Sequence, residues 1–389
     1  MAEEKEIKMC KVTVDGETIE VPEGTTILQA ARKIGKHVAP PTMCYYEPLE
    51  DTGGYCRTCL VEVTQGSERD PRPMPKLMAS CKTAVQDGMV VGNKTSQRVL
   101  DAREGVVEFL LINHPLDCPV CDQAGECKLQ DLSYEHGQDE SRLDFRKRTF
   151  ERIDIGDQIQ LHMNRCIMCY RCVKLAEQLT EPRQHGVLYR GDKSEIATYI
   201  EKALDSEFIG NVIDVCPVGA LTDKTFRFKN RVWFLKPVDA HRDCPTCKGK
   251  VRLWYRGDEV FRVTTRRNEW WEAEDWICNT CRFDKKKTSD WVIEGPSRVY
   301  QGSVISNNHA SGNKRTTKPK NVLPEVMKWE PKFTFDIHDQ SDVNRTDKDI
   351  SKIYGPPTSK DYLDENPKKS TEGKELTDIR GKDPKKRTP

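Results

Sequence analysis

The chain has 389 residues, and its 63 Lys and Arg residues nearly balance its 62 Asp and Glu residues, which leaves a net charge of +1 at pH 7. This balance gives no electrostatic reason to expect nucleic-acid binding, and no apolar run approaches the roughly 20 residues that cross a bilayer. The acidic N-terminus has no apolar segment of the secretory type, so we expect a chain that stays in the cytoplasm or is already in a mature form.

Sixteen cysteines are the dominant feature of the composition. In a cytosolic chain, where thiols are kept reduced, closely spaced cysteines bind metal more often than they form disulfides. The C-x2-C spacing recurs along the chain, and most groups end in a fourth ligand candidate. The sequence therefore predicts an α+β protein built from several metal-binding modules.

The first predicted module, residues 1–95, begins as a small α+β unit. Apolar residues alternate on both sides of an Asp-Gly turn at residues 15–16, which predicts a β-hairpin. Thr26, or the threonine before it, can cap a helix over residues 27–33. A strand pair, a helix and then a cysteine-bearing loop is the order of a β-grasp ferredoxin.

The first cysteine group lies in this module and consists of Cys44, Cys56, Cys59 and Cys81. Four thiolates suit a [2Fe–2S] cluster, and a glycine-rich loop before Cys56 lets backbone N–H groups approach the cluster sulfurs. A zinc site would use similar ligands. The preceding β-grasp pattern favours the cluster.

The second predicted module, residues 96–150, opens with helical apolar spacing from residue 96 to residue 112. The second group follows and consists of His114, Cys118, Cys121 and Cys127. Three thiolates and one imidazole can hold the four irons of a [4Fe–4S] cluster, and the neutral imidazole would change its charge and potential. A lone histidine is usually an ordinary surface or core residue, but Pro115 and the short offset to Cys118 aim this one at the same site. Zinc is the competing metal.

The third group, in a predicted ferredoxin-like module over residues 151–230, consists of Cys166, Cys169, Cys172 and Cys216. Its spacing matches the bacterial ferredoxin [4Fe–4S] run. Residues 166–179 are predicted to be helical, so that three cysteines form a seat that the distant Cys216-Pro217 pair closes. No further cysteine follows closely after Cys172, which indicates one cluster rather than two.

The fourth group lies in a predicted β-rich module over residues 231–285 and consists of Cys244, Cys247, Cys278 and Cys281. Two C-x2-C pairs separated by strands are typical of a zinc ribbon, and a third [4Fe–4S] cluster is equally open. The remaining Cys10 sits on an alternating strand and is expected to be a small buried hydrophobe. Residues 286–389 are charged and cysteine-free, so we expect an extended or disordered tail, or one that wraps a partner.

Nothing in the sequence indicates a substrate site. There is no G-x-G-x-x-G motif after a strand, no P-loop and no persuasive nucleophile–base set, so we assign no catalytic residue. A chain with cluster sites and no substrate site is expected to relay electrons between partners.

The order of these motifs resembles one family, the large iron–sulfur subunit of respiratory complex I (NADH:quinone oxidoreductase, 75 kDa type). The resemblance covers residues 7–285 and is carried by the β-grasp module and by the stretches 114–121, 165–173 and 216–233. It implies an electron-transfer role in the peripheral arm, from a flavin subunit that binds FMN and NADH through the clusters towards quinone. The implied partners are that flavin subunit, a ferredoxin-like two-cluster subunit and other peripheral-arm subunits, on the cytoplasmic side of the bacterial inner membrane.

Two departures from the family and three alternatives accompany this resemblance. Many relatives continue into a molybdopterin-enzyme-like domain, where this chain has the charged tail, which makes it a short form. Some bacterial relatives carry an extra off-path cluster with C-x2-C-x3-C spacing, but Val251 stands where the third cysteine would be. The alternatives are an electron-transfer subunit of an NAD-linked hydrogenase, the corresponding subunit of a formate dehydrogenase, and a zinc-stabilised scaffold without redox activity.

Overall fold

The structure, a computed structural model, describes residues 8–138, 140–142, 147–151, 153–179, 185–198 and 206–296. All of them fall within the first of two units into which the chain divides, Met1–Val322. The predicted tail from residue 297 onward lies outside the described residues. In the described part, no helix is both long and apolar enough to span a membrane.

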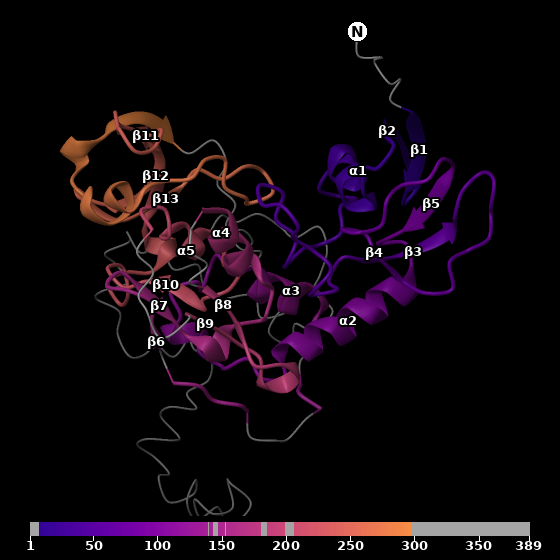
Figure 1. The fold of residues 1–389 in the computed structure, drawn as a ribbon, viewed down its shortest axis with the longest axis horizontal. Helices are drawn as coiled ribbons and strands as arrows, with labels where there is room; N and C mark the ends of the chain where they lie inside the picture. The colour runs from indigo at the N-terminus through magenta and orange to yellow at the C-terminus, as the bar shows by residue number, and fades with distance from the viewer. Residues whose placement is uncertain are drawn as a thin grey trace, which may run out of the picture. The chain divides into compact units, whose positions relative to one another are not determined.

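The N-terminal region forms a five-stranded sheet in the order β2-β1-β5-β3-β4 (Figure 1). The strands are β1 (Met9–Val14), β2 (Glu17–Pro22), β3 (Leu60–Gln65), β4 (Met78–Ala79) and β5 (Met89–Gly92). The predicted hairpin is confirmed, since β1 and β2 pair antiparallel around Asp15 and Gly16, whose φ angles are 48° and 90°. β1 also runs parallel to β5, which gives the strand order of a β-grasp.

Helix α1 (Ile27–Ile34) covers this sheet and confirms the predicted helix. Thr26 caps it through a reciprocal capping box with Gln29, which satisfies two backbone donors at the helix start. The apolar face of α1 packs into one core cluster with residues of β1, β3 and β5. Cys10 is 3% exposed in that cluster, as predicted for a small buried hydrophobe.

Helix α2 (Gln97–Leu111) begins at its Ser96 cap and leads from the sheet towards α3 (Lys128–His136), as Figure 1 shows. The predicted helix over this segment is confirmed. Arg103 of α2 is 1% exposed and donates hydrogen bonds to the carbonyl of Thr58 and to Asn93 Oδ1. These bonds attach α2 to the loops of the β-grasp sheet.

In its described residues, the next region forms two small sheets and two helices. β6 (Ile153–Asp154), β7 (Ile159–Leu161) and β10 (Leu221–Asp223) form a sheet in the order β10-β7-β6, and β8 (His185–Leu188) pairs with β9 (Glu195–Thr198). The helices are α4 (Arg171–Leu179) and α5 (Asn211–Val215). The prediction of a helix from residue 166 was wrong, because α4 starts only at Arg171.

A four-stranded antiparallel sheet follows in the order β13-β12-β11-β14. Its strands are β11 (Lys236–His241), β12 (Lys250–Arg256), β13 (Glu259–Thr265) and β14 (Val292–Pro296). The predicted strands on both sides of the Gly257-Asp258 turn are confirmed. The tail was expected to start at residue 286, yet β14 pairs with β11, so residues 292–296 are part of the sheet.

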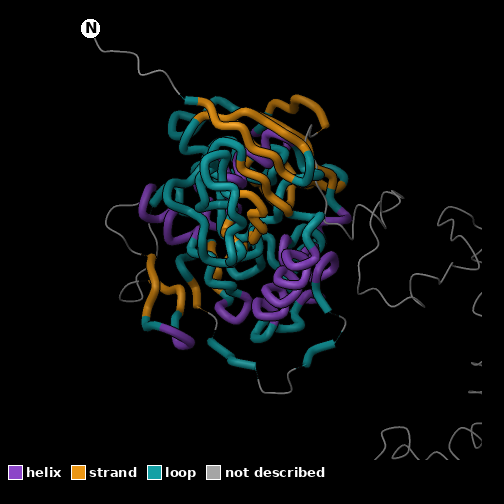
Figure 2. Tube along the Cα trace, turned by 90° about the vertical axis from the view of Figure 1, so that its right-hand side faces the viewer, coloured by secondary structure: helices purple, strands orange, loops and turns teal. Residues whose placement is uncertain are grey.

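Short helical turns and loops connect these elements (Figure 2). The turns are η1 (Cys118–Val120), η2 (Met163–Arg165), η3 (Gly191–Lys193), η5 (Val232–Phe234), η6 (Thr280–Asp284) and η7 (Thr288–Asp290). A buried ion pair connects distant parts of the chain, since Arg32 of α1 contacts Glu272 at 2.9 Å. This pair ties the β-grasp region to the segment after β13.

Candidate metal centres

The first group lies where the loops of the β-grasp sheet meet. All four of its thiols are buried, and the Sγ atoms of Cys59 and Cys81 are 3.3 Å apart. The backbone N–H groups of Tyr55 and Cys56 both point at Cys44 Sγ at 3.4 Å, and that of Gly54 points at Cys81 Sγ at 3.2 Å. Backbone donors aimed at sulfur are the arrangement expected around sulfur atoms that carry negative charge.

One glycine in this loop is required for the approach. Gly53 has a φ of 98°, a conformation that favours glycine, and a Cβ there would lie 3.1 Å from Cys81 Sγ. The thiols also affect one another: hydrogen bonds from Cys56 and Cys81 lower the pKa of Cys44, while the same contact raises the pKa of Cys56. The loop is therefore shaped to hold thiolate at close range.

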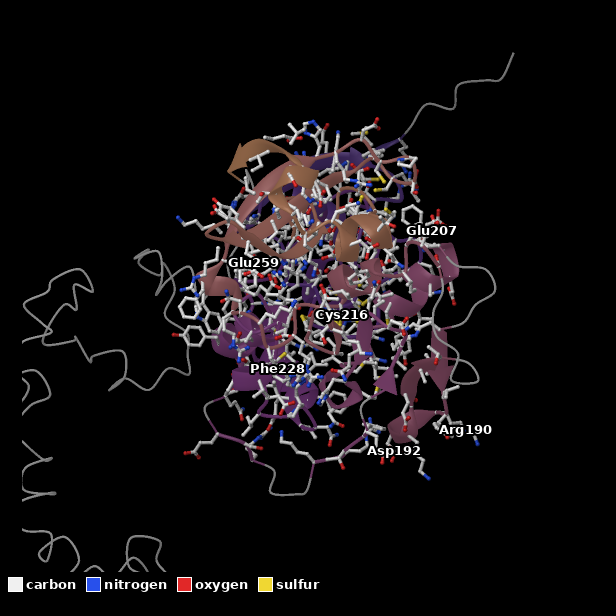
Figure 3. All side chains as sticks on the ribbon, turned by 90° about the vertical axis from the view of Figure 1, so that its left-hand side faces the viewer. Arg190, Asp192, Glu207, Cys216, Phe228 and Glu259 are labelled. Atoms are coloured by element: carbon white, nitrogen blue, oxygen red, sulfur yellow. The ribbon has the colours of Figure 1, made fainter. Side chains whose placement is uncertain are left out.

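The third group surrounds a cavity. All four of its cysteines line this cavity together with apolar residues such as Leu161, Ile196 and Val218. Cys216, labelled among the interior side chains in Figure 3, directly follows α5. Burial raises the pKa of each of the four thiols, so a bound cation is needed to keep them ionised.

Backbone conformation explains why the cysteine run is not helical. Met168 and Tyr170 have φ angles of 52° and 62°, in the left-handed region that non-glycine residues seldom adopt. Each such residue costs about 1–3 kcal/mol and persists only where its surroundings enforce it. These two residues wrap the chain around the cavity, whereas a regular helix would place the thiols of Cys166, Cys169 and Cys172 in a row about 9 Å long on one side of its axis.

The second group is only partly enclosed. Cys121 and Cys127 are buried, and Cys118 is exposed. Burial lowers the pKa of His114 to about 4, with Lys147 and Arg165 contributing, and its Nδ1 has no hydrogen-bond partner in the described structure. A neutral imidazole with an orphaned ring nitrogen fits a metal ligand.

Contacts join the second group to the third. Cys127 Sγ lies 3.9 Å from the carbonyl oxygen of Pro217, which follows Cys216 in the chain. A Cβ on Gly219 would lie 2.1 Å from Cys121 Sγ, so only glycine leaves room for that sulfur.

Arg165 makes a further connection between these two groups. It directly precedes the third group and donates to Asp117 Oδ2 at 2.8 Å, beside the second group. Its positive charge acts with burial to lower the pKa of His114, and it acts against burial at Cys121, where the pKa is raised overall. Arg165 thus ties the start of the third group's loop to the second group, on which its charge acts.

Contacts also join the first group to the third. The rings of Tyr55 and Tyr170 lie with centroids 4.6 Å apart, and Arg171 donates to the carbonyl oxygen of Tyr45 at 2.6 Å. One apolar core cluster includes cysteines of all three groups, namely Cys44, Cys56, Cys127, Cys169, Cys172 and Cys216. Sequence spacing predicts the groups, but not this adjacency.

The fourth group is the most tightly convergent. Its four Sγ atoms all lie within 4.8 Å of one another, with Cys244 and Cys278 at 3.8 Å and Cys247 and Cys281 at 3.6 Å. Burial by itself would raise the pKa of Cys244. The backbone N–H groups of Thr246 and Cys247 and the nearby Arg242 outweigh burial, so the pKa is lowered overall to about 6. The two C-x2-C pairs thus meet, as their spacing predicts.

Sequence reasoning missed the buried ion pairs that support these sites. Asp214, two residues before Cys216, contacts Arg267 at 3.1 Å and also pairs with Arg282. Burial raises the pKa of Asp214, but the two guanidinium groups lower it to about 2 overall. Single charged residues in a highly charged chain carry no spacing signal that would reveal such a network.

The β-grasp sheet and the cysteine groups define an iron–sulfur protein with ferredoxin-type modules. Residues 8–96 match the family model of the 2Fe-2S iron-sulfur cluster binding domain. Residues 103–142 match the NADH-ubiquinone oxidoreductase-G iron-sulfur binding region, and residues 156–222 match the ferredoxin-like domain of NADH-quinone oxidoreductase subunit 3. The three models cover three of the predicted modules in order.

Curated relatives agree with these models. An NADH-quinone oxidoreductase subunit of Rickettsia bellii is 41% identical over 320 residues, which is 82% of this chain and 45% of the relative. The NADH-ubiquinone oxidoreductase 75 kDa subunit of Reclinomonas americana is 44% identical over 71% of this chain and 38% of its own length. Over this region the chain is similar to the 75 kDa iron–sulfur subunit of NADH–quinone oxidoreductase. It spans less than half the length of these relatives.

A solved structure also resembles part of the chain. An NAD+-reducing [NiFe]-hydrogenase in the H2-reduced state is 28% identical, with a TM-score of 0.48, and the match covers 57% of this chain and 91% of the hydrogenase chain.

Proposed function

We propose that this chain is the electron-transfer subunit of the peripheral arm of an NADH–quinone oxidoreductase, and that it has no active site of its own. In this proposal the first group holds one [2Fe–2S] cluster, and the second and third groups each hold one [4Fe–4S] cluster. The modules are residues 1–95, 96–150, 151–230 and 231–285, followed by the tail. The ligand assignment carries the similarity to these relatives over to individual residues of this chain.

The observation that carries the proposal is the adjacency of the three groups. A relay needs redox centres close together, and here Tyr170 of the third group's loop touches Tyr55 of the first group's loop. On the other side, Cys127 lies 3.9 Å from Pro217. The third group contacts both of the others, which supports the order first, third, second.

The residues of each site have separate tasks. When bound, an iron–sulfur cluster supplies reversible single-electron chemistry. The thiols hold the iron, and the N–H groups of Gly54, Tyr55 and Cys56 stabilise negative charge on sulfur in the first group. In the third group, apolar residues such as Leu161 exclude water from the cavity. In the second group, His114 stays neutral and so leaves one less negative charge on that site than a fourth thiolate would.

The proposed partners follow from this role. A flavin subunit that binds FMN and NADH would deliver electrons, and a ferredoxin-like two-cluster subunit would receive them on the way to quinone. We place the chain peripherally, on the cytoplasmic side of a bacterial inner membrane, without a membrane span or a nucleic-acid partner of its own.

Metal analysis tests the proposal directly. Protein purified without oxygen should be brown and contain about ten irons per chain, from one [2Fe–2S] and two [4Fe–4S] clusters. Preparations should also contain matching labile sulfide, and a flavin-containing partner should co-purify. A colourless chain without labile sulfide would contradict the proposal and leave the zinc-stabilised scaffold standing.

The imidazole ligand has its own test. His114→Cys should keep a cluster but shift its midpoint potential downwards, because thiolate adds a negative charge where imidazole is neutral. A redox titration followed by EPR measures this shift. Identical titrations of parent and variant would show that His114 does not bind the cluster.

Two other electron-transfer assignments use the same modules. An NAD-linked hydrogenase or a formate dehydrogenase subunit would carry the same three clusters but different partners. Identification of the co-purifying subunits separates these cases: quinone-reducing membrane subunits support the proposal, and a hydrogenase or formate dehydrogenase catalytic subunit contradicts it.

A further inference from the structure

The relay leaves the fourth group without a role. Cys244 and Cys247 lie in the loop between β11 and β12, Cys281 lies in η6, and Cys278 lies two residues before η6. The geometry points to a single tetrahedral zinc ion bound by these four thiolates, rather than a third [4Fe–4S] cluster. We infer that this ion is structural and that it holds the last β-rich module against the third group.

The first argument is the distance between the sulfurs. Zn–S bonds of about 2.3 Å in a tetrahedron place the sulfurs about 3.8 Å apart. Two sulfur pairs match this spacing, at 3.8 Å for Cys244 with Cys278 and 3.6 Å for Cys247 with Cys281, and all four Sγ atoms lie within 4.8 Å of one another. Each pair takes one cysteine from each C-x2-C element.

The second argument is the contrast with the third group in the same molecule. A [4Fe–4S] cluster binds each cysteine through a different iron, so the four thiols must stand around a hollow that admits the cube. The four thiols of the third group stand around an apolar pocket. The four Sγ atoms of the fourth group instead converge around one position. They can surround a single ion and occupy all four of its tetrahedral coordination positions, as in structural zinc sites.

The third argument is the shape of the loop that carries Cys244 and Cys247. We call each C-x2-C element a knuckle, and this loop is the first one. The N–H of Gly249 points at Cys247 Sγ at 3.4 Å, and Gly249 has a φ of 63°. A Cβ at this position would lie 2.0 Å from the carbonyl oxygen of Arg242, so the turn requires glycine. The loop thus returns to β12 while keeping both thiols directed at the same point.

The fourth argument is charge. One Zn2+ with four thiolates carries a net charge of about −2, and partial burial of that charge needs compensation. The guanidinium group of Arg242 lies close enough to Cys244 and to Cys281, one thiol from each knuckle, for these thiols to raise the pKa of Arg242. It therefore supplies positive charge where the site needs it.

The position of η6 explains what the ion would stabilise. Asn279, between the two cysteines of the second knuckle, accepts a hydrogen bond from the N–H of Gly210 at 2.9 Å and donates to the carbonyl of Ser206 at 3.0 Å. Arg282, directly after Cys281, pairs with Asp214 of α5. Because α5 ends next to Cys216, fixing η6 also fixes the backbone that presents this thiol.

Two matched cysteine variants of the full chain test the inference. Zinc, iron and labile sulfide are measured per chain in the parent, in Cys281→Ser and in Cys172→Ser, all purified without oxygen. We expect about one zinc in the parent and in Cys172→Ser, and a loss of at least tenfold in zinc in Cys281→Ser. Cys281→Ser should retain most of its iron, whereas Cys172→Ser should lose about four irons.

A measurement on the parent keeps the test independent of whether Cys281→Ser folds. X-ray absorption at the zinc edge should give four sulfur neighbours at about 2.3 Å. Zinc with mixed or fewer sulfur ligands, a single iron in place of zinc, or about four additional irons that depend on Cys281 would each overturn the inference. One zinc in a chain without iron would refute the proposed relay but support the zinc site.

Discussion

Replacing Asp214 by asparagine should destabilise the junction between the third group and the β-rich module. Asp214 is buried at the end of α5 and accepts charged hydrogen bonds from Arg267 at 3.1 Å and from Arg282. The substitution leaves both guanidinium groups buried without their counter-charge. Removing one partner of a buried ion pair costs about 3–5 kcal/mol, mainly because the other charge remains uncompensated.

This cost should be visible in thermal unfolding. At about 2 °C per kcal/mol for a large folded region, the melting temperature should fall by about 6–10 °C. Iron content after purification should also fall, since Cys216 follows Asp214 by two residues. Circular dichroism of oxygen-free samples measures the melting temperature, and a colorimetric assay measures the iron.

A surface variant of the same chemistry is the control. Asp70 pairs with Arg72 at 2.7 Å, but both side chains are more than half exposed, so Asp70→Asn should leave the melting temperature unchanged within error. If Asp214→Asn melts at the same temperature as Asp70→Asn, the buried network does not stabilise the fold.

Gly219→Ala should remove about four irons, because the new Cβ would lie 2.1 Å from Cys121 Sγ. The control is Gly105→Ala in α2, where the new Cβ meets open space. This variant should keep all its iron, and its free energy of unfolding should rise by about 0.5–1 kcal/mol. Full iron in Gly219→Ala would contradict the close approach of Gly219 to this thiol. Burial lowers the pKa of His185 to about 4, below its unfolded value of about 6.5. The stability that this histidine contributes above pH 6.5 is therefore lost as the pH falls towards 4. At pH 5.5 the loss should be about 1.4 kcal/mol. His185→Leu should reduce this pH dependence in denaturant unfolding, and equal pH slopes in parent and variant would refute the assignment.

Local signals predicted the regular elements well. The threonine cap at residue 26 and the apolar spacing after Ser96 both act within a few residues, and the helices α1 and α2 begin where these signals stand. The Asp15-Gly16 turn is equally local, because its positive φ angles suit this dipeptide in a hairpin.

The same reasoning failed at the third group for a tertiary reason. The spacing of its first three cysteines is compatible with a helix, yet Met168 and Tyr170 take left-handed conformations there. No short-range preference favours this path. The backbone follows it because the thiols must face one cavity that is closed from the far side by Cys216, more than forty residues later.

By itself, the sequence predicted four cysteine-containing groups and determined the short elements around them, since these elements depend on local conformation. The tertiary structure alone decided how the groups relate. It places the third group beside both the first and the second. It also arranges the thiols of the third group around a pocket and brings those of the fourth group together around one position. Such distances depend on packing between residues far apart in the chain, as in the contact of Arg32 with Glu272. Spacing carries no record of that packing, because many three-dimensional arrangements satisfy the same local pattern.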